Sequence, residues 1–286
     1  TVTAVNNPMI LPAIIGTSIG LGKTAYSSSL TRSTVIGVTT ANSLTTGTDN
    51  TLFGYAAGYS NIAGNYITAV GSYAAYFTTA SDVTAVGYQS LYSNTLGQKN
   101  VSVGQASYSN TTGSYNTAMG YQASNNNVVG SYVSSYGYQA LRANLTDSMS
   151  AFGYQSLTSN TTGIQNSAFG YLSLTTNITG SSNVAFGYQA LMTANTDGNS
   201  AFGTNALELC NSDDNTAIGR DSLNTLTTGI NNTSLGSHSG IGLVSGSNNV
   251  LLGYNTTPYQ SSTTGSIVIG ANVTGKRAIP TTNGNN

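Results

Sequence analysis

The sequence predicts an all-β protein, a parallel β-solenoid (β-roll) of about 16 coils. Three observations predict this class. One glycine recurs at a nearly constant interval along almost the whole chain, as at Gly37, Gly54 and Gly71. Valine, isoleucine, threonine and tyrosine, which favour strands, recur in fixed positions around that glycine. Between these positions lie glycine, asparagine and threonine, which favour turns.

The recurring glycine, called here the anchor glycine, defines the repeat. Its period of about 17 residues is too short for a helix pair or a propeller blade but suits one coil of a solenoid. Stacked coils bury together what one coil cannot bury alone, so neighbouring coils stabilise each other. The anchor glycines are Gly20, Gly37, Gly54, Gly71, Gly87, Gly104, Gly120, Gly137, Gly153, Gly170, Gly187, Gly203, Gly219, Gly236, Gly253 and Gly270.

Each position of the repeat has its own composition. The residue four before the anchor is Asn in nine copies, the residue after it is Tyr in eight, and the residue four after it is Leu in seven. A second glycine lies seven residues before most anchors, as at Gly113 and Gly163, and predicts a turn with positive φ. Identical side chains are expected to stack on themselves, as asparagine ladders and aromatic stacks do in cross-β structures.

The residue directly before the anchor is large and apolar in every copy, and five of the six Phe lie there. We predict that this position forms the core. The core residues that we expect are Phe53, Phe152, Phe169, Phe186, Phe202, Ile218, Leu235 and Leu252. So thin an interior, together with the Tyr and Leu positions, predicts that part of the apolar surface is buried against other chains, most simply in an intertwined or side-by-side homotrimer.

The amino-acid composition excludes several classes of function. Only seven Lys or Arg and eight Asp or Glu occur in 286 residues, far fewer than in an average soluble domain. A net charge of −1 offers no basic face, so we expect no nucleic-acid partner and no binding to anionic lipid. The longest apolar stretch, residues 8–16, is too short to span a bilayer, so we expect a soluble chain without membrane insertion.

Coil sequences such as "NTAIG", "NVAFG" and "NSAFG" carry a resemblance to a known family. They resemble the YadA-like head of trimeric autotransporter adhesins, and they look even more like the "GYQAL" and "NTTG" arrays of viral and phage tail fibres. The resemblance covers about Thr17 to Thr274 and implies a trimeric β-solenoid at a virion or cell surface. The repeats here are longer than those of the adhesin heads, and no stalk, anchor barrel or chaperone segment is visible.

The ends of the chain differ from the array. We predict three parts: a cap or joint to a preceding fibre part over 1–16, the array over 17–274, and a tail over 275–286. A solenoid exposes a sheet edge at each end that a cap must cover. In the tail, Lys276, Arg277 and Pro280 would blunt such an edge.

Motifs for catalysis or metal binding fail on inspection, so we expect no enzyme activity, no metal and no cofactor. Ser18 in "GTSIG" matches a nucleophile elbow, but the single histidine, His238, takes the position held elsewhere by Gln. "GLGKT" lacks the first glycine of a phosphate loop. The lone Cys210 predicts a small buried residue, and Asp213 and Asp214 predict a solvated turn.

Asparagines in Asn-X-Ser/Thr sequons would be glycosylated if the protein matured in a eukaryotic secretory pathway and these turns were exposed. Turn chemistry alone also explains sequons in a repeat built from Asn and Thr. Such sequon asparagines include Asn110, Asn144, Asn160, Asn177, Asn231, Asn232, Asn255 and Asn272.

The expected function is structural and adhesive: a fibre shaft or surface fibre of a virus or phage that holds or forms a host-attachment element. The alternative is a bacterial trimeric adhesin head or an extracellular matrix filament. An ice-binding solenoid would need several regular Thr columns, and only one is present. The partners expected are further copies of the chain and, through tyrosine rows such as Tyr121 and Tyr138, cell-surface glycans. A specific site should interrupt the repeat, which is least regular over 124–148 and 208–214.

Overall fold

The computed structural model describes residues 19–21 and 32–275. The chain divides into two compact units, residues 1–164 and 165–286. The predicted cap over 1–16 lies outside the described residues, and so do Lys276, Arg277 and Pro280 of the predicted tail. The two units are built alike, and each is described by itself.

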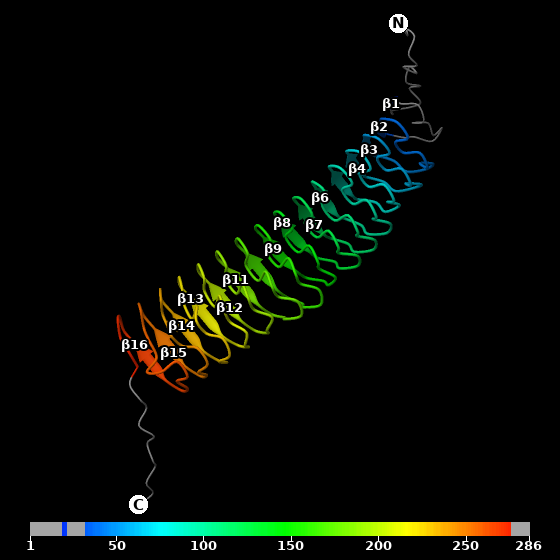
Figure 1. Cartoon of the computed structure of the whole chain (residues 1–286). Helices are drawn as coiled ribbons and strands as arrows, with labels where there is room; N and C mark the ends of the chain where they lie inside the picture. The colour runs from blue at the N-terminus through cyan, green and yellow to red at the C-terminus, as the bar shows by residue number, and fades with distance from the viewer. Residues whose placement is uncertain (1–18, 22–31, 276–286) are drawn as a thin grey trace, which may run out of the picture. The chain divides into compact units, whose positions relative to one another are not determined.

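In the first unit, nine three-residue strands pair in parallel, each with the next along the chain (Figure 1). The register keeps equivalent residues opposite each other, as in the pair Phe53 and Val70. The strands are β1 Ile19–Leu21, β2 Thr34–Ile36, β3 Thr51–Phe53, β4 Thr68–Val70, β5 Thr84–Val86, β6 Val101–Val103, β7 Thr117–Met119, β8 Ser134–Tyr136 and β9 Ser150–Phe152.

The second unit contains seven strands with the same pairing. Phe186 of β11 lies between Phe169 of β10 and Phe202 of β12 in the ladder. The strands are β10 Ser167–Phe169, β11 Val184–Phe186, β12 Ser200–Phe202, β13 Thr216–Ile218, β14 Thr233–Leu235, β15 Val250–Leu252 and β16 Ile267–Ile269. The predicted fold class, an all-β parallel β-solenoid, is confirmed.

The middle residue of each strand from β2 to β16 points into the coil, and its two neighbours do not. Alternation along a strand dictates this pattern, because successive side chains point to opposite faces. In most strands the inward residue is Ala or Ser, as at Ala118, Ala185 and Ser234, and these side chains are fully buried. Large residues before the anchor glycine therefore lie on the outer face.

The leucine four residues after the anchor supplies most of the interior volume. Leu141, Leu157, Leu191 and Leu207 are fully buried. Each has a φ near +50°, which costs a non-glycine residue roughly 1–2 kcal/mol. Full burial of a leucine side chain contributes about 2 kcal/mol or more, so burial offsets the strain. The backbone keeps this strained conformation because it directs the leucine side chain into the interior.

Interior residues compensate for one another in size. In β3 the inward residue is Leu52 in place of Ala, and the position four after the anchor is Gly58 in place of Leu. A Cβ on Gly58 would lie 3.1 Å from the Leu52 methyl groups. In the second unit, Gly240 makes room for leucines of the two neighbouring coils, since a Cβ there would lie 2.6 Å from Leu223 Cδ2 and 3.1 Å from Leu251 Cδ1. Volume-conserving exchanges of this kind keep a core packed.

The anchor glycine permits close stacking of successive coils. Gly120 has a φ of +127°, and a Cβ there would lie 2.5 Å from the carbonyl oxygen of Gly137 in the next coil. Real Cβ atoms do not approach an oxygen so closely. Both the backbone conformation and the space therefore require glycine, which explains why the repeat keeps it without exception.

The second glycine of the repeat has a different role from the one predicted. Gly64 and Gly113 are not among the residues with positive φ, so the predicted positive-φ turn is wrong there. Crowding is the cause instead: a Cβ on Gly64 would lie 2.5 Å from the Ala80 carbonyl oxygen and 2.7 Å from Asn61 Oδ1. Small residues such as Ala80 and Thr196 also occupy this buried position.

The asparagine four before the anchor joins each coil to the next through both ends of its amide. The Asn116 Nδ2 group donates to the Gly130 carbonyl at 2.8 Å, and its Oδ1 accepts the Val133 N–H at 2.9 Å. We call this series the asparagine ladder. In the second unit its side-chain acceptors are, in order, Asn166, Asn183, Asn199, Asn215, Asn232 and Asn249.

A second series of buried asparagines lies beside the ladder and bonds to the same glycine carbonyls, as Asn100 and Asn110 both do at Gly113. Asn94 and Asn110 each donate to the carbonyl of the glycine three residues later. The Asn110 Nδ2 also donates to Asn94 Oδ1 at 2.7 Å, which links two coils. Amide side chains thus satisfy backbone groups that would otherwise be buried without partners.

Replacing Gly120 with Ala should destabilise the first unit by both backbone strain and a steric clash with the next coil. The loss should exceed that at a glycine where Ala causes backbone strain but no clash. A matched control is Gly242→Ala in the second unit, where φ is +83° and a Cβ would meet nothing within 4 Å. We expect about 1–2 kcal/mol for the control and at least about 2 kcal/mol more for Gly120→Ala. Urea unfolding measures both, and equal losses would contradict the close approach of the coils.

Replacing Asn116 with Ala should cost about 2–4 kcal/mol of unfolding free energy, because it leaves the buried Val133 N–H and Gly130 carbonyl without their partner. The control, Asn126→Ala, removes an exposed amide from the same coil and should change stability by less than about 0.5 kcal/mol. Thermal and urea unfolding would test the pair. Similar small effects from both variants would show that the ladder does not stabilise the stack.

Candidate functional site: an outward apolar face

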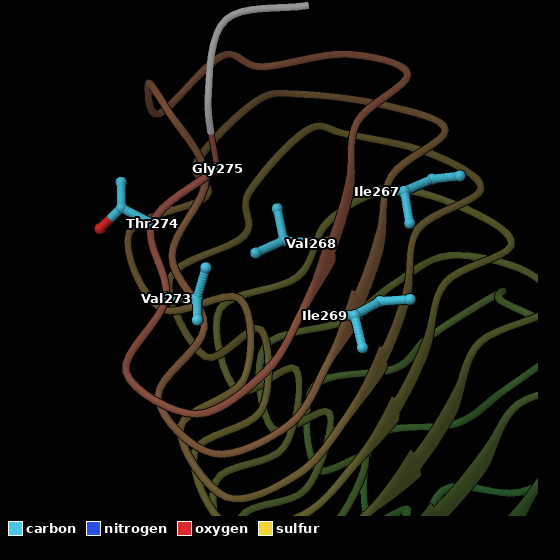
Figure 2. A pocket seen from close by; sticks show the side chains of 6 residues that line it. All are labelled: Ile267, Val268, Ile269, Val273, Thr274 and Gly275. Carbon is cyan, nitrogen blue, oxygen red and sulfur yellow. The ribbon is translucent and has the colours of Figure 1, made fainter.

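Large apolar side chains stand on the outer face of every strand whose side chains are described. Figure 2 shows the pattern at β16: Ile267 and Ile269 point away from the coil, and Val268 points inward on the side of Val273. The residue directly before the anchor glycine is exposed or partly exposed along the described array, with exposed fractions of 51% at Phe53 and 55% at Phe186. We call these residues the outward column.

The prediction that this column forms the core of the chain is wrong. Phe53, Phe186, Phe202, Ile218 and Leu235 are exposed, and Phe152, Phe169 and Leu252 are only partly covered. The physical reason is the alternation along the strand. A coil of this length encloses a narrow interior, which Ala from the strand and Leu from the turn already fill. The Phe ring next to the inward Ala therefore points outward.

A second outward column lies on the other side of the anchor glycine and is rich in tyrosine. Tyr121, Tyr138 and Tyr154 stack in sequence, with centroids 5.5 and 5.2 Å apart. In the second unit Tyr171 and Tyr188 stack at 5.3 Å. The outward column stacks too, as Tyr136 does on Phe152 at 4.6 Å. The predicted aromatic stacks are confirmed, and within the single chain these rings are on the surface.

Together the outward column and the tyrosine column form what we call the apolar face. Its members carry no charge except at Arg220, which takes a tyrosine position in the second unit. Contiguous exposed apolar surface on this scale is typical of interaction sites. Parallel strands are, moreover, usually covered on both faces. The geometry therefore marks this face as the candidate functional site.

Arg220 belongs to the one charged cluster that touches the histidine. His238 Nε2 lies 3.3 Å from Asp221 Oδ2 and 3.4 Å from Arg220 Nη2, and its Nδ1 lies 2.9 Å from Ser237 Oγ. His238 is partly exposed. Arg220 is already paired with the Asp221 carboxylate at 3.5 Å, so the cluster balances its own charge.

Five of the eight asparagines named above are buried in the two amide series: Asn110, Asn144, Asn160, Asn177 and Asn232. The expectation that these turns are exposed is wrong for them, because their side chains bond to backbone groups inside the coil. Asn231 and Asn272 are exposed, and Asn255 is partly exposed. Only these three sequon side chains are accessible in the folded chain.

Cys210 is buried, as predicted, and takes a position of the second asparagine series. Burial raises the pKa of its thiol above the ordinary value. Asp213 and Asp214 are exposed in a turn, which confirms the second prediction. Asp213 Oδ1 accepts the Asp197 N–H at 2.9 Å. Within the described residues, no group of three or more His, Cys, Asp or Glu could hold a metal ion.

The repeat irregularities at 124–148 and 208–214 do not interrupt the coils. β8 pairs in register with β7 and β9, and β12 pairs in register with β13. The hollow in Figure 2 lies at the last described coil and is lined by Ile267, Val268, Ile269, Val273, Thr274 and Gly275. These residues hold the same inward and outward positions as their counterparts elsewhere, so the hollow is the end face of a stack.

In the part of the chain that the structure describes, no helix is long and apolar enough to cross a membrane. Comparisons with protein-family models, with curated proteins and with solved structures found no match.

Proposed function

We propose that this chain is a segment of a surface fibre of a virus or phage, a homotrimer that holds or forms a host-attachment element. The observation that carries the proposal is the apolar face. A monomer would leave the side chains of this face half in water along both units, and association is the ordinary way to cover such a surface.

A second copy of the same chain is the partner that best fits this face. The face repeats at every coil, so its partner must present apolar groups at the same spacing over many coils. A second copy of the chain meets this requirement because it carries the same apolar residues at the same spacing. Closed rings are the common form of such self-association, and the resemblance to fibre repeats favours three chains.

The other features of the fold suit a mechanical and adhesive function. Within each unit, successive described coils are joined by strand pairing and close glycine contacts, and in many coils also by the asparagine ladder. Among the described residues no group of three or more His, Cys, Asp or Glu could hold a metal ion, and the charged residues of the sequence are few. Such a stack would separate an attachment point from a particle surface while keeping its own shape.

Sedimentation equilibrium of the full chain tests the proposal. We expect a mass of three chains for the wild type. Phe186→Asp with Phe202→Asp should dissociate the trimer, because two charges would be buried in each interface. The control Thr228→Asp adds a charge nine residues after an anchor glycine, away from the apolar face, and should leave the mass unchanged. A folded wild-type monomer would overturn the proposal.

A further inference from the structure

One aromatic cluster in the first unit departs from the repeat. Tyr59, Tyr76, Tyr92 and Tyr108 form a single stack along β3 to β6, with successive centroids 4.8, 5.1 and 5.0 Å apart and planes within 11°. Phe77 packs edge-on against Tyr76 at 4.7 Å. We call these five rings and Tyr73 the tyrosine cluster.

Tyr73 connects this cluster to the tyrosine column of the apolar face. Its ring lies 5.6 Å from Tyr76 and 6.3 Å from Tyr92 on one side. On the other side it lies 5.2 Å from Tyr55 and 6.4 Å from Tyr88. Eight aromatic rings therefore join in one surface over four coils.

The fold does not require aromatic rings at this place. Tyr59, Tyr76 and Tyr92 come five residues after an anchor glycine, and the same position holds Arg142, Thr158, Thr175, Met192 and Glu208 in other coils. Tyr73 likewise takes a position that is Gln in five other coils and is never Tyr elsewhere. Because coils form equally well with these other residues, packing alone does not explain the concentration of tyrosine.

The chemistry of the cluster indicates what it would bind. None of its side chains carries a charge, and burial raises the pKa of both Tyr73 and Tyr76, so their phenols remain protonated. The surface offers apolar rings beside hydroxyl groups that both donate and accept. Tyrosine also gives large contact areas at low entropic cost, as in antibody binding loops.

We infer that the tyrosine cluster is a binding site for a neutral oligosaccharide. Sugars of this class combine apolar C–H faces with many uncharged hydroxyl groups, which matches rings edged by phenols. The absence of charge disfavours sialylated or sulfated glycans. This inference rests on the proposed attachment function and names its ligand class and its site. It places the site on one stretch of the first unit, where tyrosine replaces the residues found at the same positions in other coils, and not along the whole tyrosine column.

Glycan-array binding of the full chain, followed by titration, tests the site. The array carries neutral, sialylated and sulfated oligosaccharides, and the strongest neutral binder is titrated by tyrosine fluorescence, which is usable because the chain has no Trp. Tyr76→Thr with Tyr92→Thr installs the residue found at Thr158 and Thr175 and should weaken binding at least tenfold. The control, Tyr115→Thr with Tyr132→Thr, removes a similar stacked pair at 5.1 Å and should not change it.

Three results would overturn the inference: no neutral oligosaccharide binds, only charged glycans bind, or the cluster variant binds as well as the wild type. Attachment to host cells that survives glycosidase treatment but is lost in the cluster variant would assign a protein partner instead. Circular dichroism confirms that both variants fold. Sedimentation equilibrium of the same variants tests the trimer independently of sugar binding. A chain that forms a trimer but binds no sugar would contradict the proposed binding site and leave the proposed trimer intact.

Discussion

Close approach of successive coils is the constraint on which the rest of this structure depends. At the anchor glycine the backbone of one coil lies against the carbonyl of the next, with no room for a Cβ. Parallel three-residue strands supply few hydrogen bonds on their own, so most backbone groups of a coil must find partners in turns. Backbone groups of the neighbouring coil provide many of them, and buried asparagine amides provide others where the repeat keeps asparagine.

The same constraint separates inside from outside. Each short coil encloses little volume, so alanine on the strand and leucine in the turn fill it. Phenylalanine and tyrosine then have no place inside and stand on the surface in rows. The residues that looked most like a core are therefore the residues available for association, and the fold itself produces a continuous apolar face.

The sequence was sufficient to predict the fold class, the period and the stacking of like on like, because a fixed glycine spacing with strand and turn residues leaves few alternatives. It was insufficient to place the side chains. Phe186 and Leu191 are equally apolar in sequence, and only the strand alternation and the left-handed turn at Leu191 show which one points inward. The buried sequons, such as Asn110 and Asn160, were misplaced for a related reason. Asparagine is common in exposed turns, and nothing local indicates that its amide caps a buried backbone group.

The tyrosine cluster could have been found from sequence by comparing coils position by position. Tyr59, Tyr76 and Tyr92 share a column in which other coils carry Thr, Arg or Glu. What the sequence could not supply was their mutual contact and the bridge that Tyr73 makes to the neighbouring column. Residues that differ from the repeat indicate a site only when the structure shows that they contact one another.

Hydrogen exchange of the backbone amides tests the central claim, that side-chain amides hold the coils together. The Val133 N–H donates to Asn116 Oδ1, and the Asn199 N–H donates to Asn183 Oδ1, each through a buried bond between coils. The account predicts that these two amides exchange as slowly as the strand amide of Thr117, which donates to the Val133 carbonyl at 2.8 Å. Exchange at the rate of exposed turn amides would show that the ladder is open in solution and would contradict the account.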